Sequence, residues 1–333
     1  MDPLSDVLSL LKPQSYLTAG FDAGGDWAVL FDGQIGRIKC YAVTSGACLL
    51  SVDGAGKPVR LVAGDCFVLP TGRSFVLGSG PDVEPAPAEE VFSRPQRDGA
   101  VVHNGGGGVF MIGARFDVIG RHAGLLLRTL PPIIHLDGSS DQSALRWSLE
   151  RMQEEVREQR PGSTLIAHHL AHMMLVQVLR LHLAEPLECG VGWFYALSDP
   201  RIGAAIGAMH EDPAYRWTLG ELAKRAAMSR STFSERFRHK VGETPMEYLT
   251  RWRMMLASEK LIGGDGLANV AFSLGYRSEN AFNTAFKRVM GCAPRRYARR
   301  LGSQSDSAGH PSVAPDRRGT AAVPDVHPDP ELV

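Results

Sequence analysis

The sequence lacks the features of a membrane or secreted protein. It has no apolar run of about eighteen residues, and no basic start followed by an apolar stretch and a small-residue cleavage site. Its five cysteines are scattered, odd in number and free of any C-x-x-C pair. This pattern favours small buried thiols kept reduced over a redox pair. We therefore expect a cytoplasmic location and no membrane contact.

Motifs for catalysis are also missing. "HHLAH" places His168 and His172 four residues apart, but the H-E-x-x-H glutamate is absent and the surrounding residues are apolar, so packing or a dimer contact is favoured over a metal. "HNGGGGVF" is not followed by Lys-Ser or Lys-Thr, which favours a hairpin loop over a phosphate loop. No Ser/His/Asp or Cys/His constellation stands out. The sequence predicts no enzyme activity, no metal and no cofactor.

Net charge is zero overall, but the charges are unevenly distributed. Residues 1–199 hold 16 Lys and Arg against 22 Asp and Glu, a net of −6; residues 200–301 hold 18 against 9, a net of +9; and residues 302–333 hold 2 against 5, a net of −3. A basic excess of this size predicts a polyanionic partner, with nucleic acid favoured over a merely solvated basic surface.

The period of the apolar residues changes along the chain. Residues 1–138 carry short β-prone runs broken by Gly, Pro and Asp, which is typical of a sandwich or barrel. Residues 139–185 carry apolar positions at helical spacing and predict two helices, which pack on the barrel or on a second subunit. Residues 186–198 suggest a linker, residues 199–301 form the basic domain, and residues 302–333 are Pro/Ser/Gly/Asp-rich and predict a disordered tail.

The basic domain contains an internal repeat. "GETPMEY" and "GCAPRRY" share the pattern G-x-x-P-x-x-Y, and the match extends upstream. We name residues 219–248 the first copy and residues 267–297 the second copy. The matched pairs are Leu219/Leu267, Leu222/Val270, Ala223/Ala271, Ser229/Ser278, Phe233/Phe282, Phe237/Phe286, Gly242/Gly291, Pro245/Pro294 and Tyr248/Tyr297.

Each copy has the spacing of a helix-turn-helix. A short apolar helix precedes a tight turn, and Gly275 permits a positive φ there in the second copy. Ser229 and Ser278 stand where they can cap the next helix. Paired phenylalanines bury one face of that helix, and its other face is polar and suited to a major groove. Helical hairpins without a DNA role are the alternative, and the basic residues on the polar faces argue against it: Arg230, Arg236, Arg238, Lys240, Lys287 and Arg288.

The segment between the copies predicts one long helix. Thr244 to Ile262 is a run of helix-favouring residues that would span about 28 Å at 1.5 Å per residue. Major grooves on one face of DNA recur about every 34 Å. A stiff helix of this length can therefore present both copies to adjacent groove segments.

On these residues, the region from about Asp199 to Arg300 resembles the AraC-type (arabinose-regulator) family of bacterial transcription factors. "GYRSENAFNTAFKRVMGCAPRRYARR" is its most specific part. The resemblance implies base contacts in the first copy and in the second, with phosphate contacts further along each helix. The implied DNA-binding residues are Arg230, Ser231, Ser234, Glu235, Arg238, Ser278, Glu279, Asn280, Asn283, Thr284, Lys287 and Arg288.

The front half resembles part of a cupin barrel. "GDCFVLPTGRSF" fits G-x5-P-x-G-x2-H with Gly64, Pro70 and Gly72, but Phe75 stands where the metal-binding histidine would be, and the partner H-x-H is absent. "LPPIIHL" (residues 130–136) is similar to a stretch in a subgroup of AraC-type regulators. The barrel is therefore interpreted as a sensor or structural module rather than a metal enzyme.

The sequence predicts an α+β multidomain protein: a cupin-like β-barrel, a helical dimerisation segment and an all-α double helix-turn-helix. Its predicted function is sequence-specific regulation of transcription on double-stranded promoter DNA, with family precedent favouring activation. A homodimer is expected, and a small-molecule effector and a contact with RNA polymerase are further candidate partners. A ligand-free dimerisation barrel, or a cupin enzyme fused to a DNA-binding domain, remain alternatives, and ligand-binding residues are unassigned.

Overall fold

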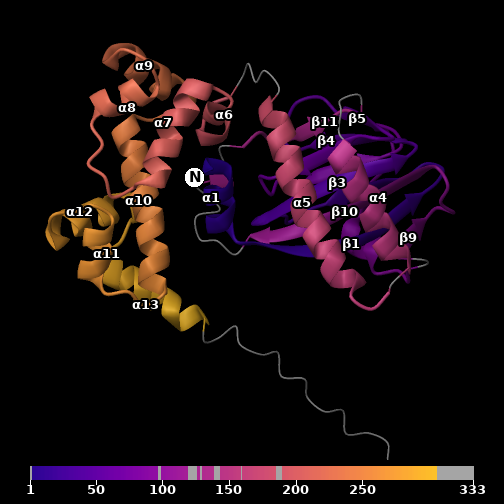
Figure 1. Cartoon of the computed structure of the whole chain (residues 1–333). Helices are drawn as coiled ribbons and strands as arrows, with labels where there is room; N and C mark the ends of the chain where they lie inside the picture. Colours follow the sequence, from indigo (N-terminus) through magenta and orange to yellow (C-terminus); the bar gives the residue numbers. More distant parts are fainter. Residues whose placement is uncertain are drawn as a thin grey trace, which may run out of the picture.

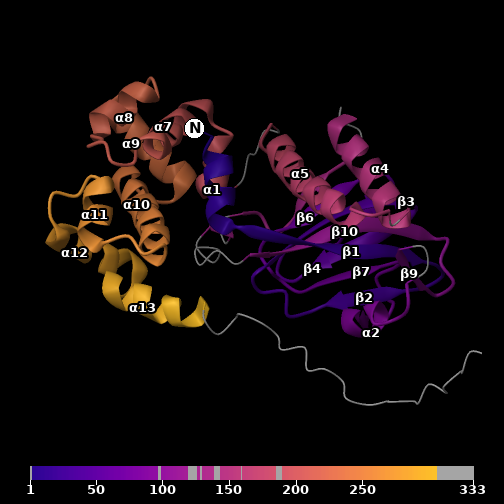
Figure 2. The same cartoon turned by 60° about the horizontal axis from the view of Figure 1, so that its bottom comes forward.

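The computed structural model describes residues 2–96, 99–118, 126–127, 130–138, 143–158, 160–184 and 190–305. Figures 1 and 2 show a strand-rich unit and a helical unit side by side, with the N-terminal helix α1 (Pro3–Leu11) between them. Most of the predicted disordered tail, residues 306–333, lies outside the described residues, whereas residues 302–305 belong to the last helix. No described helix is long and apolar enough to cross a membrane.

The strand-rich unit consists of two sheets. One has the strand order β11-β6-β3-β10-β1-β9 and the other the order β5-β4-β7-β2-β8; most neighbours are antiparallel, but β1 pairs with β9, and β2 with β8, in parallel. The strands are β1 Pro13–Ala23, β2 Ala28–Phe31, β3 Arg37–Ser45, β4 Ala47–Val52, β5 Val59–Val62, β6 Cys66–Leu69, β7 Phe75–Gly78, β8 Ala86–Pro87, β9 Ala100–His103, β10 Val109–Val118 and β11 Ile134–Leu136.

The cupin-like fold is confirmed, but the strands do not close into the expected barrel. Within the described residues, the two sheets share no hydrogen-bonded strand pair and face each other as a sandwich. Phe75, which stands where cupin enzymes carry a metal ligand, is buried at the start of β7 and stacks on Phe31, with ring centroids 4.5 Å apart. A phenyl ring has no lone pair for a metal, so the interior at this position is an apolar core.

The two helices predicted after the strands are present. They are α4 (Ser143–Glu158) and α5 (Ser163–Ala184), and both lie on the outer face of the six-stranded sheet (Figures 1 and 2). The buried stripe of α5 includes Leu170, Met174 and Val178, spaced for one helix face. His172 also packs inward: its ring lies edge-on to Phe116, and its nitrogens lie 2.9 Å from the carbonyl oxygens of His168 and Pro13. The histidine therefore joins α5 to β1.

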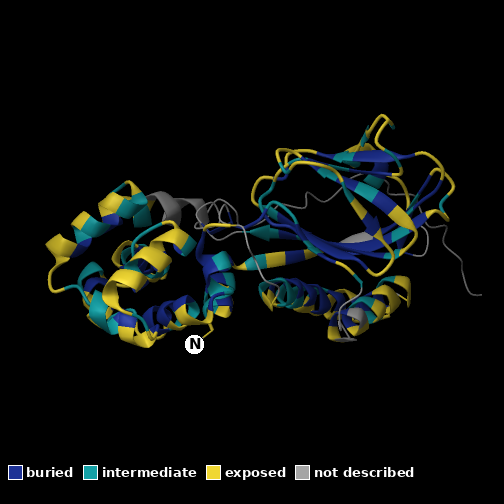
Figure 3. Cartoon of the chain, turned by 90° about the horizontal axis from the view of Figure 1, so that it is seen from above, coloured by how far each residue is buried: buried dark blue, intermediate teal, exposed yellow. Residues whose placement is uncertain are grey.

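The buried apolar side chains on either face of the six-stranded sheet form two clusters, and Figure 3 marks the buried residues along the ribbon in dark blue. One core fills the space between the sheets and includes Phe31, Phe67 and Phe75. The other lies between the six-stranded sheet and the helices, and continues into the helical unit through Leu11 of α1 and Trp193. The two units therefore share one continuous apolar core.

The helical unit follows the predicted order. One short helix, α2 (Ala88–Phe92), belongs instead to the strand-rich unit and packs against the five-stranded sheet. The remaining helices are α6 Trp193–Leu197, α7 Pro200–Glu211, α8 Leu219–Arg225, α9 Arg230–Val241, α10 Pro245–Ile262, α11 Leu267–Ser273, α12 Glu279–Met290 and α13 Pro294–Ser305.

The segment expected to be a linker, residues 186–198, carries structure in its described part. Helix α6 occupies Trp193–Leu197, and Trp193 and Phe194 are buried. The Trp193 indole donates to the carbonyl of Leu126 at 3.1 Å, and the Gly192 amide donates to the carbonyl of Lys240 at 2.9 Å. The described part of this segment is therefore packed between the sandwich and the first copy and is not a solvent-exposed linker.

Helix α1 makes a second connection between the units. His210 on α7 is buried, and its ring stacks on Trp252 with centroids 3.7 Å apart. Burial lowers the pKa of His210 to about 3, and the charge of Arg251 acts in the same direction. The neutral ring donates from Nδ1 to Asp6 Oδ2 at 3.2 Å and accepts from the Tyr248 hydroxyl at 2.9 Å. Lys12 adds an ion pair to Glu259 on α10.

Candidate nucleic-acid interface

Both copies begin their second helix with the predicted serine cap. Ser229 accepts from the amide of Thr232 at 3.2 Å, and Ser278 accepts from the amide of Ala281 at 3.3 Å. Each hydroxyl satisfies an amide that has no partner within the helix. Gly242 and Gly291 end these helices in the left-handed region, at φ 87° and 75°. The local sequence therefore fixes both ends of α9 and α12.

The turns before these helices have the same geometry but different residues. The amide of Met228 donates to the carbonyl of Ala223 at 2.9 Å, and that of Tyr276 donates to the carbonyl of Ala271 at 3.0 Å. The residue before each amide is left-handed: Gly275 at φ 81°, as predicted, and Ala227 at φ 51°. Glycine adopts this region freely, whereas alanine is strained there.

One face of each second helix is buried by the expected phenylalanine pair. The ring centroids of Phe233 and Phe237 lie 5.6 Å apart, as do those of Phe282 and Phe286, and all four side chains are fully buried. Tyr248 packs edge-on against Phe237, and Tyr297 against Phe286. The tyrosine of G-x-x-P-x-x-Y thus closes each core, which explains why the pattern occurs twice.

Helix α10 connects the two copies, and its 18 residues span about 27 Å. Thr244 and Glu247 form a capping box, and Pro245 is the first helical residue. Its first half contributes Tyr248 and Trp252 to the first copy's core, whereas its second half contributes residues such as Leu261 to the second's. Both copies are therefore anchored to one continuous helix, visible at the centre of the helical unit in Figure 1.

The predicted DNA-binding residues lie on the opposite, polar faces of α9 and α12. Ser234 and Asn283 are half-buried and the other ten are exposed. Two surface hollows follow these faces. One is lined by Ser231, Ser234, Glu235, Arg238 and His239; the other is lined by Leu267, Glu279, Asn283, Thr284, Lys287, Ala293, Pro294 and Arg295.

Some of these polar groups are already engaged within the protein. The Ser231 hydroxyl lies 3.1 Å from that of Ser229, and the Thr284 hydroxyl donates to the carbonyl of Asn280 at 2.9 Å. Ser278 serves as a cap. Arg230 lies across α8, because a Cβ on Gly220 would come within 2.8 Å of its guanidinium. Ser231, Ser278 and Arg230 lie at the N-terminal ends of α9 and α12, whereas Thr284 lies at the middle of α12.

The structure also changes the set of candidate residues. Arg236, expected on the basic polar face, pairs with Asp199 at 2.6 Å and ties α9 to the start of α7. His239 and Arg295 line the hollows but were not predicted. His239 continues the polar face of α9 and could have been found by helical spacing. Arg295 lies on α13, and only the fold brings it beside α12.

The comparisons with known proteins agree with both units. Residues 2–184 match the cupin family model, and residues 222–300 match the helix-turn-helix domain model. A Streptomyces antibioticus protein described as an AraC-like transcription regulator is 46% identical over 300 residues, covering 89% of this chain and 98% of that protein. The chain belongs to the AraC-like family of transcription regulators.

More distant AraC-like relatives match over similar lengths. The transcriptional activator RclR of Escherichia coli is 28% identical over 307 residues, covering 90% of this chain and 98% of that protein. Among solved structures, the DNA-binding domain of AdpA in complex with a target DNA is 30% identical, covers 32% of this chain and 97% of that one, and has a TM-score of 0.31. The match to the helix-turn-helix domain model and the identity to AraC-like transcription regulators show that this chain is a DNA-binding transcription regulator.

A metal does not fit the cupin domain of this AraC-like chain. Phe75 occupies the ligand position, as described above, and within the described residues no three His, Cys, Asp or Glu side chains are grouped to hold an ion. The described cysteines of this domain, Cys40, Cys48 and Cys66, are buried, and burial raises the pKa of the Cys48 and Cys66 thiols to about 12. They are therefore thiols within the apolar core.

Proposed function

We propose that one subunit reads two adjacent major-groove segments of promoter DNA, one with α9 and one with α12. The observation that carries this proposal is the exposure of both polar faces beside surface hollows, with α10 setting their separation. Asn280 and Asn283 suit adenine edges, and Glu235 and Glu279 can accept from cytosine. Arg238, Lys287 and Arg288 lie further along the helices, where phosphate contact is favoured.

The test is selection of duplex DNA from a random library by the full-length protein, followed by footprinting of the selected sites. The expected site has two conserved blocks about one helical turn apart for each subunit. A single conserved block, unchanged when α12 is altered by Asn280→Ala, would contradict reading by both copies.

We further propose that the protein acts as a homodimer through α4 and α5. Helix α5 buries one stripe on the sheet, and its other side exposes Leu165, Ile166 and Met173 at 40% or more of their surface; Trp147 on α4 is 56% exposed. A second copy of this chain would cover these apolar side chains. In light scattering, Ile166→Arg with Met173→Glu is expected to halve the mass, whereas Leu183→Ala, at the far end of the same helix, should leave it unchanged.

The cupin domain is proposed to control DNA binding. The protein is proposed to act in the cytoplasm, where the promoter lies, and to activate transcription through a contact with RNA polymerase. The connections that support control by the cupin domain are Asp6 to His210, Lys12 to Glu259, and Trp193 to Leu126, because each joins the sandwich or α1 to the helical unit. In a promoter fusion, deleting the gene should lower transcription; a rise would indicate repression.

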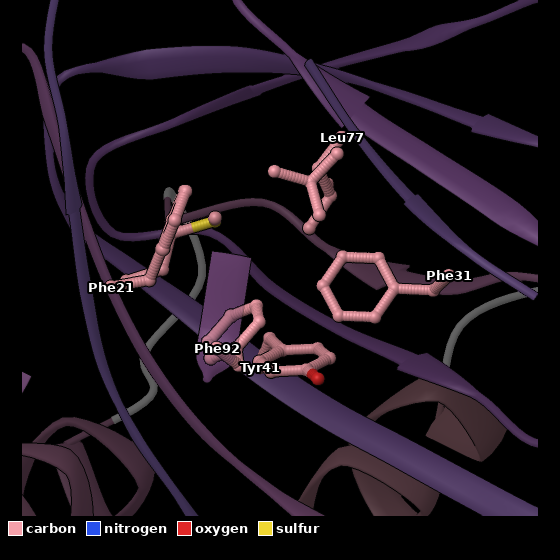
Figure 4. Close-up of a pocket in the computed structure, with 7 residues that line it drawn as sticks. Phe21, Phe31, Tyr41, Leu77 and Phe92 are labelled. Carbon is pink, nitrogen blue, oxygen red and sulfur yellow. The ribbon is translucent and has the colours of Figure 1, made fainter. Parts of the chain in front are cut away.

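A ligand-free cupin domain is the second candidate. It is favoured by the dense packing between the sheets, where the cavity in Figure 4 measures about 10 Å³. That volume holds about one water molecule. The sensor is favoured by Lys39, a charged side chain that faces the same interior. Phe75 at the metal-ligand position supports a non-catalytic role in either case.

A further inference from the structure

A buried lysine lies inside the sandwich without a counter-ion. Lys39 on β3 is 6% exposed, and its Nζ lies 5.5 Å from the ring centroid of Phe31 on the facing sheet. Within the described residues it has no hydrogen bond and no ion pair. Buried ammonium groups are costly unless they are paired, and a cation–π contact replaces only part of the lost hydration.

The neighbouring charges further destabilise the charged form of Lys39. Arg115 lies directly opposite Lys39 in the pairing of β10 with β3, and Arg37 is on the same face of β3. The nearby carboxylate, Asp117, is shared by these arginines, 3.0 Å from Arg115 and 3.6 Å from Arg37. Burial lowers the pKa of Lys39 to about 8, and Arg115 and Arg37 act in the same direction. Three cations thus face one anion.

Tyr41 adds a second polar group to the same face. It is two residues along β3 from Lys39, so both side chains point between the sheets. Tyr41 is 6% exposed, and its hydroxyl has no hydrogen-bond partner within the described residues. Burial raises its pKa, which keeps the phenol protonated and able to donate. Within the described residues, an ammonium and a phenol therefore both lack a protein acceptor.

An apolar cavity begins beside these donors. It is lined by Phe21, Val29, Phe31, Tyr41, Leu77, Phe92 and Met111, and Figure 4 shows several of these side chains around it. Tyr41 and Phe31 belong both to the lining and to the surroundings of Lys39. Phe92 is half-buried on α2, a five-residue helix without a side-chain cap, and is the lining residue best placed to give way.

We propose that Lys39 and Tyr41 bind the carboxylate of a small organic acid whose apolar body lies against Phe31 and Phe92. The carboxylate supplies the acceptor that both donors lack and neutralises the excess positive charge. Because the cavity holds about one water molecule, the body enters by displacing Phe92. The inference rests on the proposed function, in which this acid is the effector.

The test compares benzoate with its neutral isostere benzamide by titration calorimetry on the full-length protein without DNA. Phe92→Ala opens a space of about one aromatic ring, so this variant should bind benzoate more tightly than wild type does. The same variant should bind benzoate at least about tenfold more tightly than it binds benzamide. Adding Lys39→Met should abolish the preference for benzoate. Adding Lys57→Met, at an exposed loop lysine, should leave it unchanged.

A second measurement does not depend on Phe92→Ala being folded. Lys39→Met keeps the side-chain length and removes the unpaired charge, so the unliganded variant should melt at a higher temperature than wild type, whereas Lys57→Met should not differ from wild type. A structural role for the ammonium would instead lower the melting temperature of Lys39→Met.

The inference is overturned if Phe92→Ala fails to bind benzoate, if it binds benzamide equally well, or if the preference survives Lys39→Met. DNA binding by Lys39→Met, measured separately, is expected to match that of wild type without benzoate. Loss of carboxylate binding with intact reading of two groove segments would refute this inference alone. Carboxylate binding in a protein that reads only one segment would refute the proposed function alone.

Discussion

The two copies of the helix-turn-helix share their local design but differ in what surrounds them. The first copy's core, with Phe233 and Phe237, is continuous with α1, α6, α7 and the helix-covered face of the sandwich. The second copy's core, with Phe282 and Phe286, is a separate cluster that is joined to the first mainly through α10, with further contacts at Met290 and between Gly275 and Ala214. The same folding unit thus packs against the cupin unit in one case and mainly against helix α10 in the other.

This difference assigns the copies different mechanical roles. A change in the sandwich can reach α9 through Trp193, Asp6 and His210, each of which contacts the first copy or its neighbouring helices. Among the described residues, α10 is the main connection through which it can reach α12. We expect a change in the cupin unit to affect the first copy more than the second, which is connected to it less directly.

The largest expected effect comes from removing one matched phenylalanine from each core. Phe237→Ala and Phe286→Ala should each cost about 3–5 kcal/mol. In hydrogen exchange, Phe237→Ala should destabilise α1 and α7 together with α9, because they share a core. Phe286→Ala should destabilise α11, α12, α13 and the second half of α10, but not α1 or α7. Faster exchange in α1 after Phe286→Ala would break the comparison.

The next largest effect is expected from changing base-contacting residues, because each copy should read its own block of the DNA site. Asn280→Ala should lose discrimination at one base position, at a cost of about 1–3 kcal/mol, and only in the block read by the second copy. Ser231→Ala should affect the other block. The control is Lys287→Ala, which should weaken binding to all sequences and reduce the salt slope by about 1. Equal weakening on every sequence by Asn280→Ala would remove its base-reading role.

Acid should act on the first copy more than on the second. In the unfolded chain a histidine gains a proton near pH 6.5, whereas the pKa of His210 in the folded protein is about 3. The unfolded state therefore binds more protons between these values, and stability falls as the pH drops from 6.5 toward 3, by up to about 1.4 kcal/mol per pH unit. His210→Gln should flatten this slope in urea unfolding, and the exposed His239→Gln should not.

The smallest expected effect compares the left-handed turn residues. Ala227→Gly should stabilise the first copy by up to about 1 kcal/mol, because alanine is strained at φ 51°. Gly275→Ala should destabilise the second copy, since its Cβ would meet the carbonyl oxygen of Ala214 at 2.1 Å. Thermal unfolding measures both. A stabilising Gly275→Ala would show that the turns are not equivalent.

Much of the helical unit could be predicted because its signals are local. Ser229 and Ser278 act as caps, Gly242 and Gly291 end helices, and Thr244 begins α10, each within a few residues of the feature it controls. The spacing of the phenylalanine pairs likewise fixes which face is buried. The face opposite the phenylalanines must then be the exposed one, and the predicted DNA-binding residues accordingly lie outside the cores.

The remaining features could not be read from local pattern. Arg236 has the spacing of a surface cation, but Asp199, 37 residues away, pairs with it. Residues 186–198 are interpreted as a linker from the sequence, yet Trp193 and Phe194 within this segment are buried between the units. Periodicity predicted strands but not how they pair, so the closed barrel was expected where two facing sheets form.

The sequence by itself determined the double helix-turn-helix, because caps, glycines and apolar spacing act over a few residues and need no distant partner. Only the tertiary structure decided what lies inside the sandwich and how it meets the DNA-binding unit. Lys39 is one lysine among others until the pairing of β3 with β10 sets it opposite Arg115 and burial removes its water. His210 connects α7 to α1 only because folding brings Asp6, more than two hundred residues away in the sequence, within hydrogen-bond distance of its ring.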